Sequence, residues 1–111
     1  MTRQTPNLLP RLSRLLYQVG TNIRYARLRR RYTAETVAER AGITPKTLSR
    51  VERGDPAVAF GIYARVLQAL GLVDDVGALA RDDPLGNRLQ DLKLTTPKRV
   101  RRRASANEKT G

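Results

Sequence analysis

Hydrophobic residues recur at helical spacing in several segments of the chain, most clearly between Tyr32 and Gly54, which reads YTAETVAERAGITPKTLSRVERG. The first half of this segment has apolar residues three or four positions apart, at Ala34, Val37, Ala38 and Ala41. This spacing predicts a helix. Thr33 stands where its side-chain oxygen can cap the first free N–H groups, and Gly42 can end the helix in a left-handed conformation.

A second helix is predicted directly afterwards. Thr44 is a good N-cap, and Pro45 is tolerated at the first helical position because the missing N–H needs no partner there. Leu48 and Val51 would face inward, and Gly54 would end the helix. Since only three or four residues separate the two helices, they must cross steeply. This is the pattern of a helix-turn-helix unit, although an ordinary helical hairpin of a bundle shares it.

Residues 20–72 resemble the phage-repressor and Cro class of helix-turn-helix domains, the XRE family, most specifically in AERAGI and TLSRVERG. The resemblance implies an all-α, five-helix repressor-like DNA-binding domain. It also implies a structural ion pair, because Arg27 and Glu52 stand where these domains pair an arginine with a glutamate. Ala34 departs from the pattern, since the family often has a glutamine there that helps to clamp a phosphate.

The rest of the chain divides around this domain, which we place at residues 20–81. Its other helices are expected at about 21–31, 59–70 and 74–80. The helix at 59–70 has its apolar side formed by Phe60, Tyr63, Val66, Leu67 and Leu70. Val76 and Leu79 would form the apolar face of the last helix. Residues 1–19 form an N-terminal extension that is partly helical from Pro10. Its leucines either enlarge the core or form a dimer contact, namely Leu8, Leu9, Leu12 and Leu16.

A short amphipathic helix is predicted over residues 82–93, capped by Asp83 and carrying Leu85, Leu89 and Leu92. A basic tail follows at residues 94–111. The run LGLVDDVGALARDDPLGNRLQDL with the later PKRVRRR resembles HipB-like antitoxins, small transcription factors that accompany HipA-type kinase toxins. That resemblance implies an antitoxin that represses its own operon and binds its toxin. A solitary phage-type regulator remains the alternative.

Charge is distributed unevenly along the chain, whose net charge is +12. Residues 24–53 and 93–111 each carry +6, whereas residues 54–92 carry −3. A basic surface of this kind suits DNA phosphates. The tail either follows DNA, docks a partner or is disordered and raises the local concentration near DNA; we favour disorder in the free protein with phosphate contacts on DNA. Its candidate contacts are Lys98, Arg99, Arg101, Arg102 and Arg103.

Several function classes are disfavoured by composition. The chain has no cysteine and no histidine, so it contains no Ser-His or Cys-His catalytic pair and none of the usual zinc sites. We therefore expect no enzyme activity, metal or cofactor. One phenylalanine and four tyrosines form no evident stacking platform for RNA. Without an apolar run that could span a bilayer or a signal peptide, we expect a soluble, cytoplasmic protein.

The expected mechanism is the binding of a homodimer to a palindromic operator in double-stranded DNA, with the second helix of each copy in the major groove. Lys46, Ser49 and Arg50 are the predicted base-reading residues, because they line the exposed first half of that helix. Contacts with phosphates are predicted for Thr44, Thr47, Arg53 and Arg40. An adaptor whose helix-turn-helix no longer binds DNA is disfavoured by the charge on this surface.

Overall fold

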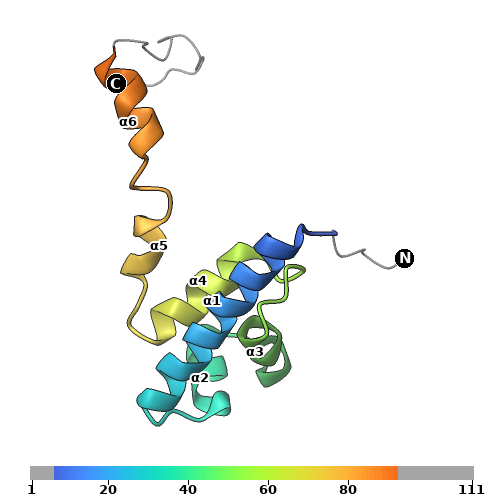
Figure 1. Cartoon of the computed structure of the whole chain (residues 1–111). Coiled ribbons are helices and arrows are strands. Elements are labelled where there is room, and N and C mark those ends of the chain that lie inside the picture. Colours follow the sequence, from blue (N-terminus) through green and yellow to red (C-terminus); the bar gives the residue numbers. More distant parts are fainter. Residues whose placement is uncertain (1–6, 93–111) are drawn as a thin grey trace, which may run out of the picture. The chain divides into compact units, whose positions relative to one another are not determined.

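The structure is a computed structural model that describes residues 7–92. Within these residues it is entirely helical, which confirms the all-α prediction (Figure 1). The elements are α1 (Pro10–Arg29), α2 (Ala34–Ala41), α3 (Pro45–Glu52), α4 (Phe60–Ala69), α5 (Asp74–Ala78) and α6 (Pro84–Asp91). The chain divides into two units, residues 1–78 and 79–111, and α6 belongs to the second.

The predicted boundary between the N-terminal extension and the first helix of the domain is wrong, because α1 runs without a break from Pro10 to Arg29. Gly20 lies in the middle of this helix and is buried. A Cβ at this position would come within 2.7 Å of the carbonyl oxygens of Val51 and Glu52. Glycine therefore serves here to bring the backbone of α1 against the end of α3, not to interrupt the helix.

The core of the first unit lies where α1 packs on α3 and where α2 packs on α3 and α4. Aliphatic side chains dominate it, as the low aromatic content predicts. The fully buried side chains with the largest volume are Leu48, Val37, Val51 and Val66. Most of the predicted inward-facing residues are therefore in place.

Two predicted core residues are exposed instead. Phe60 is 59 % exposed because it is the first residue of α4 and lies at the edge of the stripe formed by Tyr63 and Val66. Leu79 is 60 % exposed. It cannot continue the apolar face of α5, because that helix already ends at Ala78.

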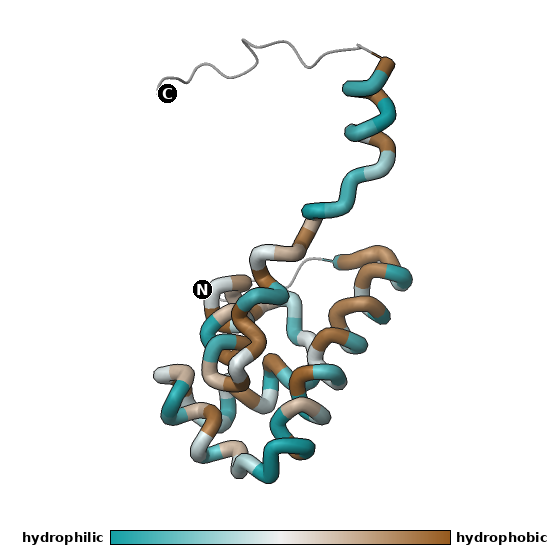
Figure 2. The backbone as a smooth tube through the Cα atoms, turned by 90° about the vertical axis from the view of Figure 1, so that its left-hand side faces the viewer, coloured by the Kyte–Doolittle hydropathy of each residue, from teal (hydrophilic) through white to brown (hydrophobic). Residues whose placement is uncertain are grey.

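The first half of α1 and the residue before it include several hydrophobic positions (Figure 2), some of which stay exposed among the described residues. Leu9, Leu12 and Leu15 are 76 %, 45 % and 45 % exposed. Of the two alternatives for the leucines of this segment, enlargement of the core does not hold for Leu9 and Leu12, whereas Leu8 and Leu16 are half-buried.

In the second unit, α6 begins as the sequence predicts. The Asp83 carboxylate accepts a hydrogen bond from the Gly86 N–H, at 3.0 Å between Oδ1 and N. Leu85, Leu89 and Leu92 are exposed within the described residues.

Candidate nucleic-acid interface

The turn between α2 and α3 is built from local interactions that the sequence predicts. Thr33 and Thr44 each cap a helix, accepting at 3.1 Å from the N–H groups of Thr36 and Thr47. Gly42 has a φ of 73°, and this left-handed residue lets the Ile43 N–H donate to the Ala38 carbonyl at 2.9 Å. This closure holds the two helices together with only three residues, 42–44, between them.

One side of α3 is buried and the other is open. Leu48 and Val51 are 1 % and 0 % exposed and attach α3 to the core. Lys46 and Ser49 lie on the exposed side of the helix. An α-helix with side chains on one face free is the element that fits a DNA major groove.

The far end of α3 is fixed by an ion pair with α1. Arg27 Nε donates to Glu52 Oε2 at 2.7 Å, and its Nη2 donates to Oε1 at 3.2 Å. The remaining nitrogen of the guanidinium, Nη1, donates to the Tyr32 carbonyl. The hydrogen bond with Glu52 raises the pKa of Arg27, against a smaller opposing effect of burial. The structure thus brings together the two residues that the family resemblance pairs.

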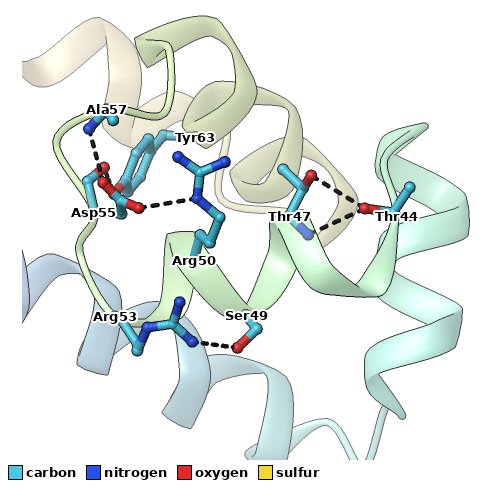
Figure 3. A network of polar contacts seen from close by, with 8 residues as sticks. All are labelled: Thr44, Thr47, Ser49, Arg50, Arg53, Asp55, Ala57 and Tyr63. Atoms are coloured by element: carbon cyan, nitrogen blue, oxygen red, sulfur yellow. Dashed lines mark hydrogen bonds and ion pairs between the residues drawn. The ribbon is translucent and has the colours of Figure 1, made fainter. Parts of the chain in front are cut away.

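After α3 the chain turns back over its own helix. Gly54, with a φ of 71°, lets Asp55 return toward Arg50, and Asp55 Oδ2 accepts from Arg50 Nε at 2.9 Å (Figure 3). The other carboxylate oxygen accepts from the Ala57 N–H at 2.8 Å. Tyr63 then donates its hydroxyl to the Asp55 carbonyl at 2.8 Å.

These contacts have a clear electrostatic effect. The Ala57 N–H and then the Arg50 guanidinium hold the pKa of Asp55 below its usual value. Burial, together with the charge of Asp55, raises the pKa of Tyr63 to about 12. The loop after α3 is therefore held by an ionised carboxylate and a protonated phenol at neutral pH.

Arg50 is consequently less free than the sequence indicates. Its side chain is 39 % exposed and already carries a partner on Nε. Within residues 7–92 its Nη atoms make no hydrogen bond. The contact between Asp55 and Arg50 was not predicted from the sequence, since Gly54, Asp55 and Pro56 indicate only a turn.

The other predicted DNA contacts are placed as follows. Ser49 and Arg53 lie side by side, with Arg53 Nη1 donating to Ser49 Oγ at 2.7 Å (Figure 3). Thr44 and Thr47 stand at the start of α3 and bond to each other. Arg40 lies at the end of α2, with its guanidinium 4.7 Å from the centre of the Tyr32 ring.

A groove of about 290 Å³ separates the exposed side of α3 from α1. Residues of α1, of α3 and of its C-terminal end line the groove, namely Tyr17, Thr21, Arg24, Tyr25, Ser49, Glu52 and Arg53. Glu52 is its only acidic residue and is already occupied by Arg27. Sequence reasoning missed the two tyrosines, whose spacing along α1 is visible but whose position beside α3 is a tertiary feature.

Two searches of the described residues bear on other kinds of site. Between residues 7 and 92 there is no cluster of three potential metal ligands. In the same range no helix is long and apolar enough to cross a membrane. The predicted tail contacts at residues 98–103 lie outside the described residues.

Comparison with known protein families gives one match over this region. Residues 18–79, which extend from the middle of α1 to just past α5, match the family described as helix-turn-helix domain. No curated protein matches the chain. The match includes the whole α2–turn–α3 unit and the elements that support it.

Proposed function

Because the chain belongs to the helix-turn-helix domain family, which makes it a DNA-binding transcription regulator, we propose that it is a sequence-specific repressor that reads an operator through α3. The observation that carries this proposal is the division of α3 into a buried side and an exposed side. Leu48 and Val51 fix the helix to the core, and the side chains of Lys46 and Ser49 are exposed on the opposite side, Ser49 with a hydrogen bond from Arg53.

Base reading is assigned to Lys46, Ser49 and Arg50, which follow one another along α3 (Pro45–Glu52). Lysine and arginine donate to the O6 and N7 acceptors of guanine, so a guanine contact is the strongest expectation. Arg53, the N-cap residue Thr44 and Thr47, whose N–H that cap binds, are assigned to phosphates. Their placement at the two ends of α3 suits the backbones that border a major groove.

Arg40 and the basic tail extend the proposed phosphate surface. Arg40 is exposed at the end of α2, and its side chain lies over Tyr32 without an ion-pair partner in the described part of the chain. For the tail the support is charge alone, since residues 93–111 carry a net charge of +6. Attraction to phosphates depends on such charge and weakens with salt.

A homodimer is proposed because the start of α1 and its N-cap residue carry leucines that the rest of residues 7–92 leaves exposed, namely Leu9, Leu12 and Leu15. Two copies joined there would present two α3 helices to one operator. A palindromic site with half-sites about one DNA turn apart would match such a pair.

The finer proposal is that the repressor is the antitoxin of a HipA-type kinase toxin. It is supported by the resemblance of the segment after Leu70 to HipB-like antitoxins. The exposed leucines of α6, a helix outside the matched domain, offer a partner an apolar face. The alternative is a solitary phage-type regulator, for which the same α3 surface suffices.

The test is to measure binding of the full chain to the DNA upstream of its own gene, with and without the protein encoded by the adjacent gene. Specific binding that tightens or changes its footprint with the neighbour supports the antitoxin. Specific binding that ignores the neighbour supports the solitary regulator. A preference for RNA, or the absence of binding at low salt, would overturn the operator proposal.

A further inference from the structure

We propose that Asp55 is a positioning residue for DNA recognition, which holds the Arg50 guanidinium so that its outer edge faces a guanine. This inference rests on the proposed function. It assigns to the loop after α3 a part in sequence selectivity, although that loop carries no predicted base contact.

The geometry of the pair separates the two ends of the guanidinium. Arginine presents five N–H donors in a rigid plane. Asp55 Oδ2 takes the single donor on Nε, at 2.9 Å. The donors on Nη1 and Nη2 have no partner among residues 7–92. These two nitrogens can bond guanine O6 and N7 together, whereas the Nε side is turned to the protein.

Asp55 is itself held from three directions, so it can act as a fixed support. Its second oxygen accepts from the Ala57 N–H, its carbonyl accepts from the Tyr63 hydroxyl, and its own N–H donates to the Arg50 carbonyl at 3.1 Å. Tyr63 is in turn 8 % exposed and belongs to the core. Asp55 thus links the core, through Tyr63, to the Arg50 side chain on α3.

Fixing Arg50 in advance matters because a free arginine must lose several rotamers when it binds. Immobilising such a side chain weakens binding by about twofold to tenfold. A single negative charge at this surface also opposes the attraction to phosphates. Asp55 should therefore strengthen binding to the correct sequence and weaken binding to DNA of any sequence, two effects of opposite sign.

This opposition defines the experiment. Asp55→Asn keeps one oxygen for the Ala57 N–H but places an amide where Arg50 Nε needs an acceptor. The full-length wild type and variant are selected on a duplex library randomised over roughly 20 base pairs, about two DNA turns. Their affinities for the selected duplex, for single-base variants of it and for random duplex are then measured.

The expected result is that Asp55→Asn binds the selected duplex about twofold to tenfold more weakly, binds random duplex at least as tightly, and loses preference at one guanine. That guanine should be the one at which Arg50→Ala loses preference. In the Arg50→Ala background, Asp55→Asn should have no further effect on selectivity.

Two controls separate this role from a structural one. Tyr63→Phe removes the bond to the Asp55 carbonyl but keeps the carboxylate and the two other contacts of Asp55, so it should lower the preference for guanine less than Asp55→Asn does. Asp75→Asn removes one equal charge from the exposed start of α5 and should also leave the preference unchanged. The thermal unfolding of each variant shows whether weaker binding follows weaker folding.

The outcomes distinguish the inference from the proposed function. Two results would overturn the positioning role alone. One is that Asp55→Asn keeps the base preference of the wild type. The other is that Asp55→Asn lowers the base preference as much in the Arg50→Ala background as in the wild type. Tighter binding of Asp55→Asn to all duplexes by the same factor would show that Asp55 only masks charge, and would overturn it too. If the wild type binds every duplex equally, the operator proposal fails and the positioning role fails with it.

Discussion

Arg27 and Glu52 face each other in a two-bond contact, 2.7 Å between Nε and Oε2, although they are separated by 25 positions in the sequence. Their side chains are only 12 % and 10 % exposed. The pair joins the second half of α1 to the last residue of α3, and so fixes α3 at the end opposite its N-cap, Thr44. Its strength should therefore affect both folding and the presentation of α3.

Glu52→Gln should lower the free energy of unfolding by roughly 2–3 kcal/mol, because it leaves a largely buried guanidinium without its counter-charge. Urea denaturation of wild type and variant measures this directly. The double variant Arg27→Met with Glu52→Met should be destabilised less than Glu52→Gln, since no unpaired charge remains. Equal stability of Glu52→Gln and wild type would contradict the clamp.

Gly20→Ala should destabilise the domain by about 1–3 kcal/mol. The added Cβ would meet backbone atoms of α3 and of Gly54, none of which can move as a flexible side chain does. Gly61→Ala is the matched control, because it also adds a methyl group to a helix but into open space. That control should be neutral or stabilising by up to about 1 kcal/mol. The midpoints of thermal unfolding of both variants test this, and equal midpoints would contradict the close contact at Gly20.

Arg50→Ala and Arg53→Ala should weaken DNA binding in different ways. Arg50→Ala should cost roughly 1–3 kcal/mol on the operator and relax the choice at one base pair. Arg53→Ala should weaken operator and random duplex alike and lower the salt slope of binding by about one. Titrations at several salt concentrations separate the two. An equal loss on both DNAs for Arg50→Ala would remove it from the base-reading set.

Acid should release the loop after α3. The pKa of Asp55 is depressed in the folded protein, first by the Ala57 N–H and then by Arg50. Such a group stabilises the fold above its unfolded pKa, near 4, and the contribution is lost as pH falls through the lower folded pKa. The stability difference between wild type and Asp55→Asn should therefore persist at neutral pH and shrink below about pH 4. A difference that is constant across this range would contradict the assignment.

Truncation after Leu92 should lower the salt dependence of DNA binding while the preference for the operator survives. The deleted residues carry a net charge of +6, and the slope falls by about 0.9 for each phosphate that the shortened protein no longer neutralises. The measurement is the same salt titration on selected and random duplex. An unchanged slope would show that the tail does not bind phosphates.

The sequence by itself determined the local features of this protein. The caps at Thr33 and Thr44, the left-handed Gly42 and the buried side of α3 can all be predicted from it, because each depends on residues within a few positions of one another. The pairing of Arg27 with Glu52 comes from a family resemblance, since no local rule connects residues so far apart.

Tertiary structure decided the features that depend on which backbones approach each other. The boundary predicted between residues 19 and 20 falls inside α1, which continues through Gly20. A glycine is needed at this position because α1 approaches α3 closely there. Phe60 lies on a plausible apolar face but falls beyond the reach of the core. Asp55 is only five residues from Arg50, but the direction in which Gly54 turns the chain decides that the two side chains meet. Local interactions select helices and caps, whereas long-range packing selects the side chains that can touch.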